Sequence, residues 1–311
     1  MAEHRLDPTP DTVTDVFSGA RAPVLTVDPG DTLVVRSLDA AGHLEGQPGP
    51  GVAAPRLIVQ SRGHCLVGPI GVRGAAPGMM LAVRVVSLRP DDWGFTVAAA
   101  RDNELNRRLG VFPGEPAWLL WDVDADLGVA RNDLGISVRL APFLGVIGLP
   151  PAEPGDHSTV PPRASGGNID CRELVAGSTL FLPVTVPGAL LCVGDGHGAQ
   201  GDGEVSGTAI ECGMTSELVI DIAADPAIST AHAVTPVGRI TFGFDTDLNE
   251  AMAQALSAML DWLQKLLGVE RATALALASP VVDLRVTQVA NQVWGVHAVL
   301  PDGALGVTSP G

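Results

Sequence analysis

Two segments near the amino terminus, PVLTVDPGDTLVVRSLD (residues 23–39) and GPIGVRGAAPGMMLAVRVVSL (residues 68–88), decide the fold class. In each segment, runs rich in Val and Leu flank a Pro-Gly turn, so each predicts a strand, a turn and a second strand. We expect two similar β-hairpins. The same strand pattern returns later in TLFLPVTVPGALLCVGD (residues 179–195) and in ELVIDIAA (residues 217–224). The sequence therefore predicts a protein built mainly from β-strands.

The composition agrees with many short strands and few helices. The chain has 37 Gly and 25 Pro against 4% aromatic residues, which favours strands separated by turns over a helical bundle. Its 311 residues, 46% hydrophobic, are enough to bury a large core. We expect one domain over residues 1–311, with a mostly β core of the β-sandwich, jelly-roll-like kind and added α-helices, α+β overall.

The carboxyl-terminal part has a different periodicity. Apolar residues recur at helical spacing between 247 and 267, and a second short helix, GVERATALALAS, ends at Pro280. The run VVDLRVTQVANQVWGVHAVLP then predicts a hairpin. These patterns divide the chain into a β-rich core (1–245), a helical segment (247–279) and closing strands (281–300). The residues expected on the buried face of the first helix are Leu248, Met252, Ala255, Met259, Leu263 and Leu266.

The charge and the amino terminus limit the partners. A formal charge of -16 repels phosphate backbones and acidic lipid, so we expect neither nucleic acid nor a membrane as partner, and a small neutral molecule fits better. The chain has no basic-then-apolar leader and no run of roughly 20 apolar residues, which predicts a cytoplasmic protein. Four widely spaced cysteines predict buried free thiols. A homo-oligomer, by default a dimer, is expected.

The segment from 167 to 211, GNIDCRELVAGSTLFLPVTVPGALLCVGDGHGAQGDGEVSGTAIE, concentrates the residues that could carry chemistry. Asp195 and His197 are two residues apart, a spacing that lets both reach one metal ion from a strand or from an irregular turn. A polar surface turn is the competing interpretation of Asp-Gly-His-Gly. The apolar strand that ends at Asp195 favours a site, because strand ends present functional residues on a rigid scaffold.

The same segment carries a family resemblance. GDGHGAQGDGEVSGTAIE (194–211) resembles the signature run of the acetamidase/formamidase family. Further matching blocks follow the family's order and cover over half the chain: LTVDPGDTL (25–33), HCLVGPIGVRGAAPG (64–78), GVIGLPPAEPGDHST (145–159), STVPPRASGGNIDCRELVAGSTLFLPV (158–184) and DLRVTQVANQVWGVHAVLP (283–301). The resemblance implies a β-sandwich that hydrolyses formamide, acetamide or another short amide to the acid and ammonia, using a divalent metal, apparently zinc, although an oxygen-rich cluster also suits Ca²⁺.

The resemblance also implies roles for particular residues. Carried over by motif, Asp39, His64, Asp195 and His197 are the expected metal ligands. Asp195, His197 and Glu211 are the expected catalytic residues, with Glu211 as general base. Such a set would activate water and stabilise the oxyanion of an attacked amide.

Other polar residues of the segment from 167 to 211 each have two possible roles. Asn168 and Gln200 are candidates for binding the substrate amide, or for stabilising turns. Asp202 and Glu204 are candidates for orienting His197, or for capping a tight turn, and Asp170 is similar. We expect His297 in the core. His4, His43 and His232 have no supporting pattern.

Two observations weigh against other amidase mechanisms. The single lysine, Lys265, lies on the polar face of the predicted helix, four residues after Asp261, where a surface ion pair is expected, so lysine-dependent amidase chemistry is disfavoured. No Gly-x-Ser-x-Gly motif appears. Two alternatives stay open: a non-catalytic β-sandwich that binds a metal or small ligand, and a family hydrolase acting on a carbamate or bulkier amide. Residues 40–63 are short and rich in Pro and Gly for the family, which leaves the substrate's size open.

Overall fold

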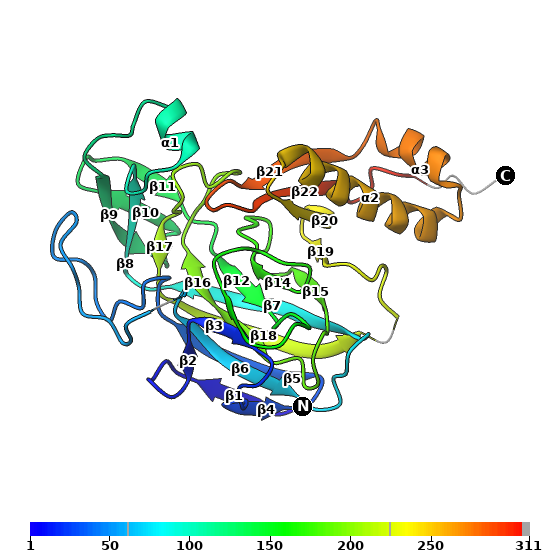
Figure 1. The fold of residues 1–311 in the computed structure, drawn as a ribbon, viewed down its shortest axis with the longest axis horizontal. Helices are drawn as coiled ribbons and strands as arrows, with labels where there is room; N and C mark the ends of the chain where they lie inside the picture. Colours follow the sequence, from blue (N-terminus) through cyan, green and yellow to red (C-terminus); the bar gives the residue numbers. More distant parts are fainter. Residues whose placement is uncertain (61, 224, 307–311) are drawn as a thin grey trace.

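Two large sheets form most of the computed structural model, which describes residues 1–60, 62–223 and 225–306. The first sheet has nine strands in the order β1-β5-β18-β7-β15-β19-β20-β22-β21, and its long antiparallel pair β7 and β18 lies near the middle of the molecule (Figure 1). Its strands are β1 (Glu3–Leu6), β5 (Asp31–Ser37), β7 (Met80–Pro90), β15 (Thr179–Pro183), β18 (Met214–Ala223), β19 (His232–Thr235), β20 (Gly238–Asp245), β21 (Asp283–Gln288) and β22 (Trp294–Pro301).

The second sheet has eleven strands and carries the signature segment. Its main path runs β11-β10-β9-β8-β17-β16-β12-β14, and β6 joins β16 from outside that path together with β2 and β4. Its strands are β2 (Val13–Thr14), β4 (Leu25–Val27), β6 (Leu66–Val72), β8 (Trp93–Ala98), β9 (Ala117–Asp124), β10 (Val129–Asn132), β11 (Ser137–Arg139), β12 (Phe143–Gly148), β14 (Gly166–Asn168), β16 (Leu191–His197) and β17 (Glu211–Cys212). A separate small pair joins β3 (Val16–Ser18) to β13 (Asp156–Ser158).

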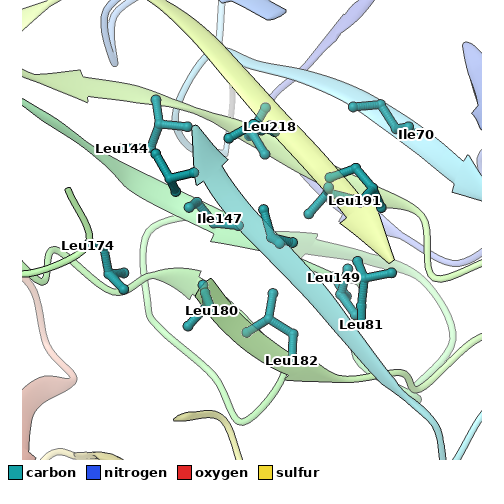
Figure 2. Close-up of a cluster of buried hydrophobic side chains, with 14 of the residues drawn as sticks. Ile70, Leu81, Leu144, Ile147, Leu149, Leu174, Leu180, Leu182, Leu191 and Leu218 are labelled. Carbon is teal, nitrogen blue, oxygen red and sulfur yellow. The ribbon is translucent and has the colours of Figure 1, made fainter. Parts of the chain in front are cut away.

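The main core lies between the two sheets. Leu81 and Leu218 of the first sheet pack in one buried cluster with Leu144 and Leu191 of the second (Figure 2). Each such side chain contributes roughly 1.5–3 kcal/mol by leaving water. The expected mostly β sandwich with added helices is confirmed.

Three helices complete the fold: α1 (Glu104–Arg108), α2 (Leu248–Leu267) and α3 (Arg271–Ala278). Asp247 caps the start of α2 through its side chain, and Gly268, in the left-handed conformation, ends it. α2 packs against β20 and β22 at one end of the molecule and shares a second core with α3 (Figure 1). The predicted closing hairpin is the pair β21 and β22.

The buried face of α2 differs from the predicted one. Ala255, Met259 and Leu263 are buried as expected, whereas Met252 and Leu266 are 39% and 48% exposed. Ala251, Ala258, Leu260 and Trp262 are buried instead. The face is rotated because small Ala251 and Ala255 allow close contact with β20: a Cβ at Gly243 of that strand would lie 1.9 Å from the Ala251 carbonyl oxygen.

The prediction of two hairpins was wrong, although the predicted turns are present. β4 pairs with β6 while β5 pairs with β1 and β18, so the Asp28-Pro29-Gly30 turn joins strands of different sheets. β6 and β7 likewise belong to different sheets. A Pro-Gly turn fixes the reversal of the chain, but the apolar pattern on either side is the same for a hairpin and for a crossing between two packed sheets.

Surface features largely follow the sequence. All four cysteines are free and buried. Lys265 is exposed as expected, but it contacts Asp225 at 3.0 Å, while Asp261 pairs with Arg271. In the described part of the chain, no helix is both long and apolar enough to cross a bilayer.

Candidate active site

Strand β16 brings Asp195 and His197 into the interior of the second sheet. All seven residues of this strand are buried, and β12, β6 and β17 pair with it. Glu211 of β17 lies directly opposite His197, and its Oε1 is 3.4 Å from His197 Nε2. Asp195 Oδ1 lies 3.5 Å from the same nitrogen. The three residues expected to be catalytic therefore meet at one point.

Two further acids, Asp170 and Glu204, join this cluster. Ligand-type atoms of Asp170, Asp195 and His197 lie within 4.8 Å of one another, and so do those of His197, Glu204 and Glu211. Asp170, Asp195 and Glu204 all have positive φ, at 53°, 59° and 43°. Non-glycine residues in this region cost about 1–3 kcal/mol each, and such strain collects at functional sites. We call these five residues the acidic centre.

Gly145 of β12 makes room for the acidic centre. A Cβ on this residue would lie 2.6 Å from Asp195 Oδ2, 2.7 Å from Asp170 Oδ1 and 2.9 Å from His197 Cε1. The carbonyl oxygen of Gly145 also accepts the N–H groups of Ile169 and Asp170, at 3.0 and 3.2 Å. A side chain here is therefore incompatible with the observed arrangement.

Burial controls the charges of the acidic centre. It raises the pKa of Asp170, Glu204 and Glu211, and the neighbouring acids raise these pKa values further. Burial also raises the pKa of Asp195, but His197 and His64 outweigh it and bring that pKa to about 2. The pKa of His197 is raised because Glu211 and Asp195 outweigh the opposing effect of burial. The four carboxyl groups share one small dry space and require protons or a cation for balance.

The acidic centre has the chemistry of a cation site. Five buried carboxylate oxygens have no hydrogen-bond partner among the described residues: Asp170 Oδ1 and Oδ2, Asp195 Oδ1, Glu204 Oε2 and Glu211 Oε2. Buried acceptors without donors are costly unless something positive faces them. Together with His197 they form a donor set of carboxylates and one imidazole, which suits a divalent metal.

Gln200 holds His197 in place. The Oε1 atom of Gln200 is 2.9 Å from His197 Nδ1, and its amide nitrogen donates to the carbonyl oxygen of Asp170 at 2.8 Å. Phe143 packs edge-on against the imidazole, with ring centroids 5.0 Å apart. These contacts direct Nε2 of His197 into the acidic centre. Gln200, expected to bind substrate, uses both of its side-chain polar atoms in these contacts.

Asp39 is not brought to the acidic centre. Its carboxylate accepts the backbone N–H of His43 at 2.6 Å and lies 2.7 Å from His43 Nδ1. Both side chains are buried, and His43 packs edge-on against Phe95. Asp39, expected as a metal ligand, thus lies outside the tight groups of ligand atoms among the described residues and forms a buried pair with His43, because the turn at 39–42 directs the carboxylate to its own loop.

His64 lies across the same cavity from the acidic centre. Its backbone N–H donates to Thr159 Oγ1 at 2.7 Å, and its Nδ1 lies 3.1 Å from that oxygen. Burial lowers the pKa of His64, and the charge of Asp195 partly offsets this effect. His64 and Asp195 line one cavity, as expected, although His64 is outside the tight groups of ligand atoms.

Asp202 is exposed and lies beside a different cluster, which includes the buried residues Glu173 and His297. Partial burial and then the charge of Glu173 raise the pKa of Asp202, while His297, Arg172 and Arg285 oppose the rise. In that cluster Glu173 accepts from Arg285 at 2.9 Å and lies 3.4 Å from His297 Nε2. His297 is fully buried, so the core histidine expected there is confirmed. The expected contact of Asp202 with His197 is made by Gln200.

A cavity of about 320 Å³ leads to the acidic centre. Asn168, Asp195, Glu204 and Glu211 line it, together with His43 and His64. Asn168 Oδ1 is buried without a hydrogen-bond partner among the described residues, which leaves its amide available to a bound molecule. The remaining lining residues include apolar Phe95, Val97, Trp118 and Val160 and polar Gln47, Arg56, Gln60, Arg101 and Asn291.

Sequence reasoning missed three elements of this site. Asp170 was grouped with Asp202 and Glu204, as a residue that orients His197 or caps a turn, Gly145 was not singled out, and His43 had no supporting pattern. The one signal for Asp170 in the sequence was its place in the family block GNID. Its position at the acidic centre depends on the pairing of β14 with β12, which brings the residues after β14 to the centre. The pairing of Asp39 with His43 had one usable signal, their i, i+4 spacing.

The fold and site define a β-sandwich with a buried histidine–carboxylate centre at the floor of a cavity, an arrangement typical of enzyme active sites. The sequence profile of the acetamidase/formamidase family matches residues 20–157 and 152–301. The chain belongs to this family, and the resemblance noted in the sequence is confirmed.

Individual relatives agree with this placement. The chain is 28% identical over 235 residues to a formamidase of Methylophilus methylotrophus, covering 59% of this chain and 57% of that protein. It is 27% identical over 217 residues to an acetamidase of Mycolicibacterium smegmatis, covering 51% and 53%. The chain thus spans just over half the length of the curated relatives it matches.

Solved structures share the fold. An acetamidase of Bacillus halodurans superposes with a TM-score of 0.84 at 24% identity, covering 96% of this chain and 97% of the other. A predicted acetamidase/formamidase of Thermoanaerobacter tengcongensis gives 0.84 at 23% identity, with 96% of each chain covered. These likenesses extend the shared fold over nearly the whole chain.

Proposed function

We propose that this protein hydrolyses a short-chain amide to the carboxylic acid and ammonia in a metal-dependent reaction. The observation that carries the proposal is the set of five buried carboxylate oxygens near His197, beside a cavity of about 320 Å³, that have no hydrogen-bond partner among the described residues. Membership of the acetamidase/formamidase family supports the amide as substrate.

Asp170, Asp195 and His197 would hold the metal, with Glu204 and Glu211 beside it. Zinc is the proposed ion, because an imidazole with carboxylates is a common zinc ligand set, and calcium is the alternative because the set is rich in oxygen. When bound, such an ion lowers the pKa of a water and polarises the amide carbonyl.

The chain's own residues bind the amide and move its protons. Glu211 is the proposed general base: Oε1 accepts the N–H of Ala209 at 2.8 Å, which fixes the carboxylate, while Oε2 is free to take a proton. The raised pKa of Glu211 suits a group that later gives the proton to the leaving nitrogen. Asn168 would donate its amide N–H to the substrate or accept from it.

His43 is proposed to contact the leaving nitrogen. Its Nδ1 lies 2.7 Å from the Asp39 carboxylate, which would leave Nε2 to accept a hydrogen bond in the cavity that His43 lines. Phe95 and Trp118 cover the cavity with apolar surface, which strengthens these polar contacts by excluding water.

An ammonia-release assay on formamide, acetamide, propionamide and urea tests the proposal, with and without a chelator. Turnover should disappear on chelation and return with Zn²⁺, and H197A should be inactive. H157A is the matched control, since His157 lies on the short strand β13 outside the cavity and its Nε2 contacts the carbonyl oxygen of Glu153 at 2.8 Å. Activity of H197A in the presence of chelator would overturn the metal mechanism.

A non-catalytic binding protein is the alternative from another class. Stoichiometric metal in the purified protein, without ammonia release from any amide tested, would select it. The cytoplasmic location and the dimer stay predictions, and light scattering on the purified protein measures the assembly directly.

A further inference from the structure

The cavity is larger than formamide or acetamide requires. Its 320 Å³ is at the lower end of the range for pockets that hold drug-sized ligands, roughly 300–1,000 Å³. Acetamide has four non-hydrogen atoms and would leave most of the space to water. A substrate that extends from the acidic centre toward the other lining residues would use it.

Side chains of both charges line the cavity. Asp195, Glu204 and Glu211 contribute negative charge at the acidic centre, whereas Arg56 and Arg101 are among the residues that line the same cavity. Both arginines are exposed, which places them toward the solvent side. Neither forms an ion pair within the ranges that the structure describes.

Arg101 lies close enough to His64, which also lines the cavity, for its charge to affect that imidazole. Burial is the main cause that lowers the pKa of His64, and the charges of His197 and Arg101 lower it further. In a chain with 35 acidic and 19 basic side chains, two unpaired arginines beside one cavity are a local reversal of the overall charge. Phe95, Val97 and Trp118 supply apolar surface in the same cavity.

We infer that the preferred substrate is a short amide that carries a carboxylate at its other end, the monoamide of a short dicarboxylic acid. The amide would lie at the acidic centre, the methylene groups against the apolar wall, and the carboxylate on Arg56 and Arg101. Acidic residues repel the anionic end and arginine attracts it, so the charge pattern also selects the productive orientation. A cationic amide would meet the opposite pattern.

This inference rests on the proposed amidase function and names its substrate class. The test compares succinamate with butyramide, a neutral amide with the same four-carbon chain, by kcat/KM for ammonia release. We expect succinamate to exceed butyramide at least tenfold. R56M and R101M should each reduce that ratio severalfold, mainly through KM, and added salt should reduce it in the unmodified protein.

R84M is the matched control, because Arg84 is an exposed arginine of β7 outside the cavity. It should keep the full preference. Equal kcat/KM for succinamate and butyramide, or a preference that R56M and R101M leave intact, would overturn the inference while acetamide turnover upholds the amidase function.

Calorimetric titration of succinamate and butyramide separates the two failures. Binding of succinamate that R56M and R101M weaken at least tenfold supports the anion-binding arginines even in a protein without turnover, and in that case it is the amidase function that fails. Equally weak binding of both amides to all variants counts against the inference.

Discussion

Replacement of Gly145 by alanine is expected to disrupt the acidic centre at its base. The new Cβ would lie 2.6 Å from Asp195 Oδ2, whereas ordinary contact begins near 3.4 Å, so this oxygen must move by about 0.8 Å. Asp170 Oδ1, at 2.7 Å, and His197 Cε1, at 2.9 Å, must move as well. Displacing three buried side chains costs about 1–3 kcal/mol of stability, as overpacked cores do.

The effect on function should be larger than the effect on stability. A displacement near 1 Å of catalytic groups lowers the rate by about 100-fold, and disturbed ligand orientation weakens metal affinity about 10–100-fold. The assays are ammonia release with acetamide, zinc affinity by competition with a chelating dye, and thermal unfolding.

G201A is the matched control for G145A. Gly201 lies next to Gln200, yet a Cβ on it meets no atom of the described chain within 4 Å, and its φ is not in the left-handed region. We expect G201A to keep zinc affinity and most activity. If G145A binds zinc and turns over acetamide as the unmodified protein does, the placement of the acidic centre around Gly145 is refuted.

Three further changes test separate parts of the site and its support. Replacing Glu211 by glutamine removes the proposed proton acceptor, so it should lower kcat about 100-fold or more while leaving zinc bound. Metal analysis alongside kcat checks this prediction, and an unchanged kcat would exclude the role of Glu211 as general base. Q200L should lower zinc affinity about 10–100-fold, because His197 loses the contact that directs Nε2. Q200E should retain most of the zinc affinity of the unmodified protein. Equal zinc affinity in the two variants would argue that Gln200 does not position His197. Glu173 governs acid stability: burial raises its pKa, but hydrogen bonding and charge from His297 outweigh burial and bring it to about 2 from 4.5. Its stabilising contribution of up to about 3 kcal/mol is therefore present above pH 4.5 and is lost as the pH falls toward 2. Denaturant unfolding of E173Q should show a smaller loss of unfolding free energy between pH 4.5 and 2 than the unmodified protein shows. An equal loss in both proteins would contradict the assignment.

Local patterns predicted the kind of element well and the pairing of elements poorly. The helix between 247 and 267 was predicted from apolar residues at helical spacing, and α2 spans Leu248–Leu267, because this periodicity is a property of residues close together in the sequence. Which strands pair depends on side chains far apart in the sequence. The turn at Asp28-Pro29-Gly30 was therefore placed correctly while its two strands were assigned to one hairpin.

The same distinction applies to the site. Asp195, His197 and Glu211 could be named because one strand and its neighbour carry them within a single sequence block. The pairing of Asp39 with His43 could not be predicted, because nothing local shows whether a carboxylate turns toward its own loop or toward a distant strand. Asp170 required the pairing of β14 with β12, which the sequence pattern does not specify.

The most direct test is anomalous scattering at the zinc edge from crystals grown with Zn²⁺. We predict one ion with His197 Nε2 and carboxylate oxygens of Asp195 and Asp170 at about 2.0–2.2 Å, at the floor of the cavity. An ion bound elsewhere, or none at saturating zinc in protein that still releases ammonia from an amide, would contradict the account.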